Sequence, residues 1–285
     1  MRLLVTGGRG QLGRSLVRAA AARGHAIVAV DADALDITAP AQIAAALREH
    51  APDVVINGAA YTGVDRAEAD RDRAFAINAD GAGHLARACA AASVPLLHVS
   101  TDYVFGGTEV RPYREDDPVS PINVYGESKA AGERQVLDVG GVVVRTSWLF
   151  GEGGPSFVHS ILRLAREQPI LRIVADQHGC PTCADDLAEA LLELAARTPS
   201  GIYHACGDGP TTWHGFAAAI VDEARRHASL ACERVEPITT AEYPTPARRP
   251  AYSVLDPGRL RALGIALPSW RPGLARVVAA ALEAP

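Results

Sequence analysis

A glycine-rich turn stands between an apolar run and a helical pattern at the start of the chain. In the segment VTGGRGQLG, residues 5–13, the glycines match G-x-G-x-x-G from Gly8 and G-x-x-G-x-x-G from Gly7. Such glycines let the backbone turn sharply and approach a pyrophosphate at the helix N-terminus. A strand, this turn and a helix predict a dinucleotide-binding unit, with a ligand-free turn as the alternative. The residues expected to contact the dinucleotide here are Gly7, Gly10, Gln11, Leu12 and Gly13.

Two charged residues give opposite indications about the coenzyme. Asp31 ends the second apolar run, about 20 residues past the turn, where an acid can bind the adenosine ribose hydroxyls of NAD. Arg9 lies inside the turn and can instead pair with the 2′-phosphate of NADP. We favour NADPH as the cofactor, and use of NADH as well stays open.

Apolar runs alternate with helical patterns through the first half of the chain, including a long helical region at 65–92. Continuous apolar strands separated by helices predict a parallel sheet covered on both faces. The strands are expected at residues 3–5, 26–30, 54–56, 96–99 and 142–145. We therefore predict an α/β, Rossmann-type doubly wound fold. A dinucleotide-binding domain is expected at 1–149 and a smaller, mainly substrate-binding α/β domain at 150–285, with some later elements returning to the first.

Charge and hydropathy exclude several other classes of protein. The formal net charge is −5 and the pI is about 6.0, so there is no basic footprint for nucleic acid. No stretch approaches the roughly 20 uncharged residues that cross a bilayer, and the first apolar run is too short for a signal peptide. The five cysteines, without an export signal, are expected to be reduced thiols in a cytoplasmic protein.

The segment INVYGESKAAGE, residues 122–133, places a tyrosine four residues before a lysine. Tyr125 and Lys129 would lie one turn apart on the same face of a helix. Tyrosine can donate a proton to a carbonyl, and a nearby ammonium would lower its pKa from the ordinary value of about 10. Thr101 follows a strand end in LLHVSTDYVF, where ligands bind in such sheets, and could orient the carbonyl. An ordinary polar helix face is the alternative for the Tyr–Lys pair.

Several segments together resemble one family. The glycine turn, STDYVF and NVYGESKAAGE occur in the order and at the intervals of the extended short-chain dehydrogenase/reductase superfamily. Within it, the chain resembles the dTDP-4-dehydrorhamnose reductase family, through segments that cover nearly its whole length. The more specific of these segments are STDYVF, RTSW and YPTPARRP.

The resemblance implies a role for individual residues. Tyr125 would donate the proton, and Lys129 would hold the nicotinamide ribose and tune Tyr125. Thr101 and Asp102 would contact the sugar. Trp148 would pack on the substrate, with a core tryptophan as the alternative. The further residues that would line the cofactor are Asp36, Ile37, Ala60, Tyr61, Thr62 and Val99.

The resemblance also implies the reaction, which is NAD(P)H-dependent reduction of the C4 carbonyl of dTDP-4-dehydro-L-rhamnose to dTDP-L-rhamnose. Two alternatives stay open: a reductase of another nucleotide-linked 4-keto-6-deoxysugar, and a non-catalytic regulatory subunit of the same fold. The expected partner is the nucleotide sugar, with neither nucleic acid nor a membrane. The chain is expected to be a monomer or a homodimer.

No metal site is expected. Some members of the resembled family are described as dimers bridged by Mg²⁺ through acidic side chains, one of them early in the first helix, where this chain has Arg14 and Ser15. The cluster His178, Cys180 and Cys183 lacks the fourth ligand of a tetrahedral zinc site.

Two adjacent arginines lie in the proline-containing segment YPTPARRP. Arginine side chains bind phosphate oxygens in a forked geometry. Arg249, with Arg248 beside it, is therefore a candidate ligand of the substrate diphosphate. An exposed basic pair without a ligand is the alternative.

Overall fold

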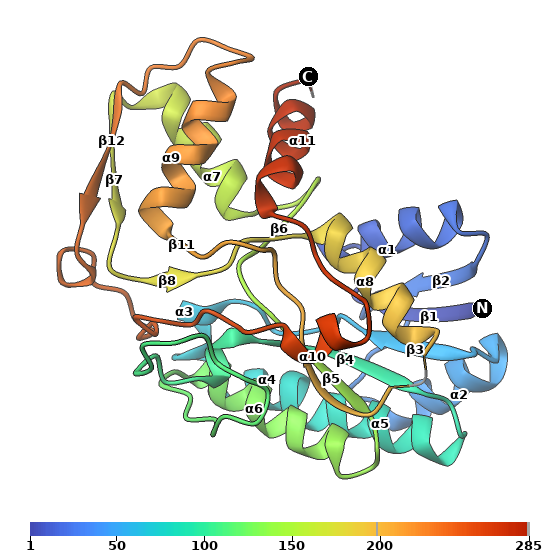
Figure 1. Cartoon of the computed structure of the whole chain (residues 1–285). Helices are drawn as coiled ribbons and strands as arrows, with labels where there is room; N and C mark the ends of the chain where they lie inside the picture. The colour runs from blue at the N-terminus through green and yellow to red at the C-terminus, as the bar shows by residue number, and fades with distance from the viewer. Residues whose placement is uncertain (198, 284–285) are drawn as a thin grey trace.

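Six parallel strands form the central sheet, in the order β10-β5-β4-β3-β1-β2 (Figure 1). The computed structural model describes residues 1–197 and 199–283. The predicted Rossmann-type parallel sheet is confirmed. Its strands are β1 (Arg2–Thr6), β2 (Ala26–Val30), β3 (Val54–Asn57), β4 (Leu96–Thr101), β5 (Val142–Thr146) and β10 (Gly201–His204).

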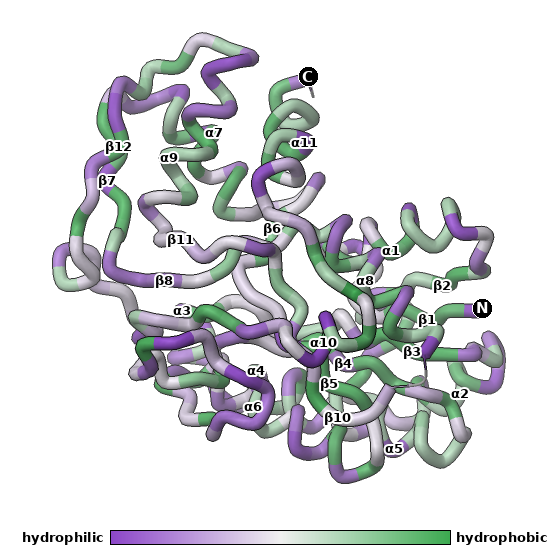
Figure 2. The backbone as a smooth tube through the Cα atoms, in the orientation of Figure 1, coloured by the Kyte–Doolittle hydropathy of each residue, from purple (hydrophilic) through white to green (hydrophobic). Residues whose placement is uncertain are grey.

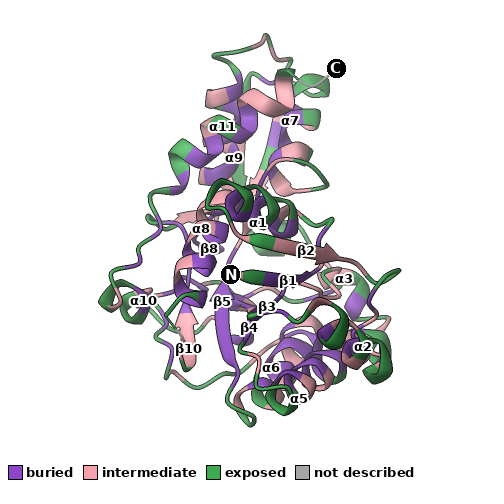
Figure 3. Cartoon of the chain, turned by 90° about the vertical axis from the view of Figure 1, so that its right-hand side faces the viewer, coloured by how far each residue is buried: buried purple, intermediate pink, exposed green. Residues whose placement is uncertain are grey.

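Helices cover both faces of this sheet. On β1, Leu3 and Val5 pack on one face and Leu4 on the other, as the alternation of side chains along a strand requires. The strands are therefore mainly apolar (Figure 2), and β5 is buried throughout (Figure 3). The covering helices are α1 (Gln11–Ala22) and α8 (Ala184–Ala195) on the first face, and α2 (Pro40–His50), α5 (Ala82–Ala91) and α6 (Val124–Leu137) on the second.

The helical region predicted at 65–92 is divided into four pieces. They are α3 (Val64–Ala67), α4 (Arg71–Phe75), the π-helical turn η1 (Ala76–Gly81) and α5. The π-helical turn contains Asn78, whose side chain bonds to both the N–H and the carbonyl of Tyr61 and to the hydroxyl of Ser128. These tertiary contacts hold the π-helical turn in place between α4 and α5.

A second apolar core lies beside the sheet, towards the top of Figure 1. Its helices are α7 (Phe157–Glu167), α9 (Trp213–Ala224) and α11 (Trp270–Glu283), and they pack beside the parallel pair β7 (Ile170–Val174) and β12 (Arg234–Ile238). The shorter elements are η2 (Asp102–Val104), β6 (Leu149–Phe150), β8 (His178–Gly179), β9 (Thr182–Cys183), β11 (Thr211–Thr212), η3 (Thr240–Glu242) and α10 (Gly258–Ala262).

Three elements that follow residue 150 lie with the first core, which is the apolar cluster between the central sheet and the helices α1 and α8. Strand β10 pairs with β5 in the central sheet, α8 packs against α1, and Leu260 of α10 is buried in the same core. The division of the chain into domains at 1–149 and 150–285 stays a prediction. None of the helices in the described part of the chain is long and apolar enough to span a membrane.

Candidate active site

The strand order reverses between β1 and β3, so the loops that follow these two strands lie side by side. Gly7, at the end of β1, has φ +72° and packs against Gly58, which follows β3; a Cβ on Gly7 would lie 2.8 Å from the Gly58 carbonyl. In a doubly wound sheet this reversal marks the crevice where ligands bind. The glycine turn therefore opens at the expected place.

The glycine turn packs directly on the first turn of α1. A Cβ on Gly13 would collide with the carbonyl of Gly7 and the backbone of Gly8. No side chain from the described residues caps α1 at Gly10, so the backbone N–H groups of its first turn are free to bind an anion. This glycine cradle fits a pyrophosphate.

Gln11 and Leu12 differ in how they support this turn. Leu12 is buried in the first core. The Gln11 amide donates to the Pro155 carbonyl at 2.8 Å, which ties the turn to the loop before α7. The Gln11 Oε1 is buried without a hydrogen-bond partner among the described residues.

Asp31 and Arg9, the two conflicting coenzyme signals, are in contact. The Asp31 carboxylate accepts from the backbone N–H of Arg9 at 2.9 Å and from its Nε at 3.0 Å. The Arg9 guanidinium also pairs with Asp33, and its side chain stays 67% exposed. Asp31 is thus partly neutralised, which reduces its repulsion of a 2′-phosphate.

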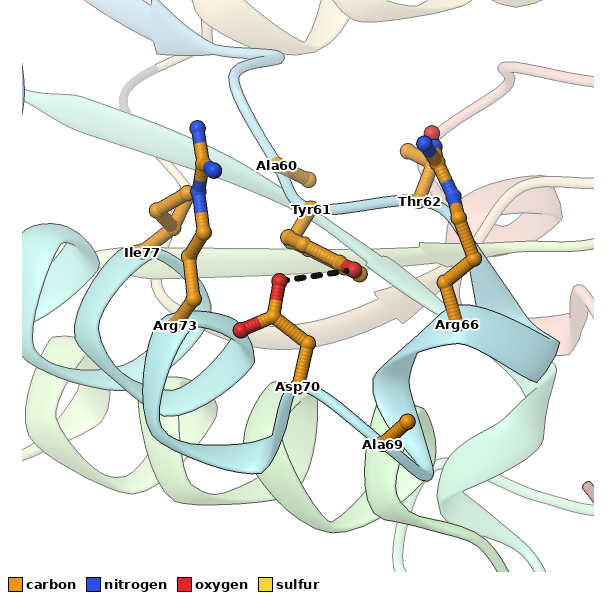
Figure 4. A pocket seen from close by; sticks show the side chains of 8 residues that line it. All are labelled: Ala60, Tyr61, Thr62, Arg66, Ala69, Asp70, Arg73 and Ile77. Carbon is orange, nitrogen blue, oxygen red and sulfur yellow. Dashed lines mark hydrogen bonds between the residues drawn. The ribbon is translucent and has the colours of Figure 1, made fainter.

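The loop after β3 lines a cavity of about 550 Å³ (Figure 4). Tyr61 lies on its floor and donates to Asp70 at 3.1 Å; burial, followed by this bond, raises the pKa of Tyr61. Arg66 and Arg73 stand on either side of Tyr61. Neither arginine was identified from the sequence, because their charges are spaced like those of an exposed helix face. The remaining lining residues are Ala60, Thr62, Ala69 and Ile77.

Asp36 and Ile37, expected near the adenine, have local structural partners. The Asp36 carboxylate accepts from the N–H and the hydroxyl of Thr38, both at 2.8 Å, and these bonds lower the pKa of Asp36. Ile37 is buried against the second face of the sheet, and a Cβ on Gly81 would meet its side chain. Their contact with adenine stays a prediction.

Helix α6 begins where the Asn123 side chain accepts from the Gly126 N–H at 2.8 Å. Tyr125 therefore lies in the first turn of α6, and it shares a small apolar cluster with Tyr61 of the β3 loop. Burial raises the pKa of Tyr125 to about 12, opposed by the Thr101 hydroxyl and reinforced by the Asp102 charge. The lowered pKa that was predicted for Tyr125 from the sequence is wrong.

The position of the Lys129 amine explains why this residue does not lower the pKa of Tyr125. Its Nζ donates to the carbonyl of Val99 at 2.7 Å and lies 3.2 Å from Nε2 of His98. The side chain is 1% exposed, and burial lowers the pKa of Lys129 to about 8. Lys129 is also the single lysine among 28 lysine and arginine residues, a signal that is visible in the sequence but was not used in the prediction.

Thr101 and Asp102 form a buried pair at the end of β4. The Thr101 hydroxyl donates to Asp102 at 3.1 Å, and the Ser253 hydroxyl donates to the other carboxyl oxygen at 2.5 Å. Asp102 is 3% exposed, and burial raises its pKa to about 7. Ser253, 151 residues away in the chain, was not identified from the sequence.

Two hydroxyls at the carboxyl end of the sheet have no hydrogen-bond partner among the described residues. They belong to Ser100 on β4 and Thr146 on β5, and both side chains are buried. Thr146 stands opposite Thr101 in the strand register. Thr146 therefore shares a face of the sheet with Thr101, whereas Ser100 lies on the opposite face. Buried polar groups are nearly always paired, so the Thr146 hydroxyl beside Thr101 is available to a polar ligand.

Trp148 follows β5 in a left-handed backbone conformation, with φ +45°. Its ring stacks on Trp213, the first residue of α9, with centroids 3.6 Å apart and planes 9° apart. It also packs tightly against Gly179. A residue other than glycine in this conformation is strained, and such strain is concentrated at functional sites.

Arg249 is held by protein groups. Its guanidinium binds both carboxylate oxygens of Asp65, at 3.0 and 2.8 Å, and the carbonyl of Ala247 at 2.8 Å. These contacts fix the segment 245–249 against α3. The contact of Arg249 with a diphosphate stays a prediction.

The candidate metal ligands lie apart. His178 is exposed, whereas Cys180 and Cys183 are buried in different apolar clusters. Arg14, in the first helix, donates to the carbonyl of Arg9. Among the described residues no group of three or more His, Cys, Asp or Glu side chains could hold a metal ion.

Three features together define the class of this protein. They are the doubly wound sheet, the glycine cradle at the point where the strand order reverses, and the Tyr–Lys pair beside a threonine that ends a strand. They are the parts of a dinucleotide-dependent oxidoreductase of the short-chain dehydrogenase/reductase type. Comparisons with known proteins identify the family.

A family model described as the RmlD substrate binding domain matches residues 1–283. The chain is 46% identical to a dTDP-4-dehydrorhamnose reductase of Streptomyces griseus, over 96% of this chain and 91% of that protein. A crystal structure of dTDP-4-dehydrorhamnose reductase from Bacillus anthracis in complex with NADP superposes with a TM-score of 0.91 at 38% identity, covering 97% of this chain and 98% of that one. The chain belongs to the dTDP-4-dehydrorhamnose reductase family, as was predicted from the sequence.

Proposed function

We propose that this chain reduces the C4 carbonyl of dTDP-4-dehydro-L-rhamnose to dTDP-L-rhamnose with NADPH, and that Tyr125 donates the proton. Family membership supports the reaction, since the Streptomyces griseus relative carries the name of this reductase. The NADP bound in the Bacillus anthracis relative supports the coenzyme. The reaction is expected to take place in the cytoplasm, in a monomer or a homodimer.

The observation that carries this proposal is the arrangement at the carboxyl end of the sheet. Tyr125 lies on α6, Thr101 ends β4, and on β5 the Thr146 hydroxyl has no hydrogen-bond partner among the described residues. NADPH, when bound, supplies the hydride. The phenol of Tyr125, whose pKa burial raises from the ordinary value of about 10 to about 12, is protonated at neutral pH, as a proton donor must be.

The remaining residues position the substrate. The Thr101 hydroxyl is held in place by Asp102 and by the N–H of Tyr103. By turning its hydrogen away from Asp102 it donates to a carbonyl oxygen without a large loss of entropy. Trp148 offers the sugar nucleotide an aromatic surface that is fixed by its stacking on Trp213. Arg9 pairs with the 2′-phosphate, which favours NADPH over NADH.

The proposal is tested by incubating the purified chain with dTDP-4-dehydro-L-rhamnose and either coenzyme. Following coenzyme absorbance and identifying the product by NMR distinguishes the alternatives. The proposal expects oxidation of NADPH and formation of dTDP-L-rhamnose. Oxidation with a C4-epimeric product would indicate a reductase of another deoxysugar pathway. An absence of oxidation, with NADPH still bound, would indicate a non-catalytic subunit.

A further inference from the structure

A row of buried polar side chains crosses the sheet and ends at Lys129. Thr6, Asn57 and His98 occupy directly opposite positions on β1, β3 and β4. Thr6 donates to Asn57 at 2.6 Å, Asn57 contacts Nδ1 of His98 at 2.9 Å, and Nε2 of His98 lies 3.2 Å from Nζ of Lys129. All four side chains are at most 1% exposed. The row starts one residue before the glycine turn and ends one turn after Tyr125.

The direction of each hydrogen bond follows from the groups that can only donate. The backbone N–H of Ala59 points at Oδ1 of Asn57 at 3.2 Å, so this atom is the amide oxygen and Nδ2 faces His98. Nδ1 of His98 must then accept. A neutral imidazole carries one proton, which therefore lies on Nε2 and is directed at Lys129.

This arrangement favours the uncharged form of the lysine. An ammonium has only N–H donors, so Nε2–H of His98 and the ammonium of Lys129 would oppose each other. A free amine has a lone pair that accepts from His98, while one of its hydrogens still reaches the Val99 carbonyl.

The surrounding charges are consistent with this. Burial lowers the pKa of Lys129 to about 8, and burial followed by the Lys129 charge lowers the pKa of His98 well below 6.5. Glu133, one turn further along α6, opposes the effect by raising the pKa of Lys129, but its carboxylate is paired with Arg145 at 2.8 Å. Tyr125, on the same helix face, is kept neutral by burial.

The composition of the chain adds an independent observation. Of the 28 lysine and arginine residues, 27 are arginines, and the one lysine is Lys129. Arginine does not lose its proton in proteins, whereas lysine titrates readily when it is buried. A titrating amine is therefore available at this position and at no other lysine or arginine side chain.

We propose that His98, held by Asn57 and Thr6, is a positioning residue that aims the amine of Lys129 and sets its charge state. The inference rests on the proposed function and on the role that the family resemblance implies for Lys129, which is to hold the nicotinamide ribose. It assigns a task to Thr6, Asn57 and His98, three residues that were not singled out from the sequence. The row also links the strand before the glycine turn to the helix that carries Tyr125.

The single lysine makes a direct test available. The full-length protein, without coenzyme, is labelled with ¹³C,¹⁵N-lysine and gives one side-chain signal, whose shift is followed across pH. We expect wild-type Lys129 to titrate well below the ordinary value of about 10.4. In His98→Asn the shorter side chain still reaches Asn57 but not Lys129, and the midpoint should rise by about one pH unit. In His98→Gln an amide oxygen can accept from the ammonium, so the midpoint should rise at least as far.

The matched control is His227→Asn, in the exposed segment that follows α9, which should leave the midpoint unchanged. A midpoint in both His98 variants that equals the wild-type value would overturn the proposal. Should either variant fail to fold, ¹⁵N-histidine NMR of the wild-type protein decides: a proton on Nδ1 of His98 would also overturn it.

Because neither measurement uses coenzyme or substrate, failure of this inference is distinguishable from failure of the proposed function. The activity readout is secondary. The pH at which the alkaline limb of kcat/KM falls should move upward in His98→Asn together with the NMR midpoint, whereas a purely structural defect would lower the rate without moving the limb.

Discussion

Tyr125 illustrates how one residue carries the proposed chemistry while its neighbours control it. Burial raises the pKa of its phenol, because it outweighs the stabilising effect of the Thr101 hydroxyl on the phenolate. Lys129 does not contribute to this balance in the structure, since its amine contacts Val99 and His98. At the scale of residues, the proposal gives proton donation to Tyr125 and orientation of the carbonyl to Thr101.

Replacing Tyr125 by phenylalanine removes only the hydroxyl. We expect Tyr125→Phe to bind NADPH with wild-type affinity and to lose about 10²–10⁴ in kcat, the usual contribution of a general acid. Stopped-flow turnover and equilibrium coenzyme binding check the two halves of this prediction. Turnover within a few-fold of wild type would remove Tyr125 from its proposed role.

Asp102 gives a prediction about stability and pH. Its pKa is about 7 in the folded chain and 3.8 as the ordinary value, so the folded protein keeps a proton that the unfolded chain loses. Stability from this group is fully present below about pH 4 and is lost as the pH rises towards about 7. Over this pH range the wild-type protein should lose on the order of 3 kcal/mol in its free energy of unfolding because of Asp102. We expect this loss to be absent in Asp102→Asn.

Urea unfolding of both proteins at several pH values between about 4 and 8 measures this difference. Subtracting one profile from the other removes the contributions of all remaining groups. Parallel profiles would show that Asp102 titrates normally.

At the scale of elements, α6 matters most because it carries both Tyr125 and Lys129. The helix is fixed to β5 by a buried ion pair, in which Arg145 binds both carboxylate oxygens of Glu133, at 2.9 and 2.8 Å. The Arg145 guanidinium also lies 5.0 Å from the centre of the Phe105 ring. A displaced α6 would move the proton donor.

Breaking this pair should therefore affect stability and catalysis together. Arg145→Met leaves a buried carboxylate unpaired, and we expect the free energy of unfolding to fall by about 3–5 kcal/mol. The double variant Arg145→Met/Glu133→Leu removes both charges and should recover most of this loss. Chemical denaturation of the two variants tests the prediction, and an equal loss in both would show that packing, not charge, holds the helix.

The elements also show what sequence reasoning can and cannot reach. The glycine turn and five of the six strands of the central sheet depend on local patterns, and each of these strands was predicted within two residues of its observed bounds. The sixth strand, β10, was not predicted from the sequence. The contacts of Lys129 with His98, and of Arg249 with Asp65, join residues 31 and 184 positions apart. Such contacts depend on the packed structure, which is why the raised pKa of Tyr125 and the paired state of Arg249 were not predicted.

For the whole molecule, a pair of stacked tryptophans stands where the chain passes from the central sheet to the second core. Trp148 follows β5 and Trp213 begins α9, and both pack against the second core. The stacked pair therefore lies in the part expected to hold the sugar nucleotide. The strained backbone of Trp148 shows that its position is imposed by these surroundings.

Removing the support of Trp148 should weaken substrate binding alone. We expect Trp213→Ala to raise KM for the sugar nucleotide about tenfold, as the loss of an aromatic pair implies, with the Kd for NADPH unchanged. Trp213→Phe, which keeps a ring, is the matched control and should lie near wild type. Equal weakening of coenzyme and sugar binding in Trp213→Ala would mean that the variant is generally destabilised.

The central claim is that hydride passes from NADPH to the sugar C4 beside Tyr125. The most direct measurement uses NADPH deuterated at the transferable position, together with dTDP-4-dehydro-L-rhamnose and the purified chain. We predict dTDP-L-rhamnose with deuterium at C4 by NMR, and almost none with Tyr125→Phe over the same time. A product without deuterium at C4, or a deuterated product formed equally fast by Tyr125→Phe, would contradict it.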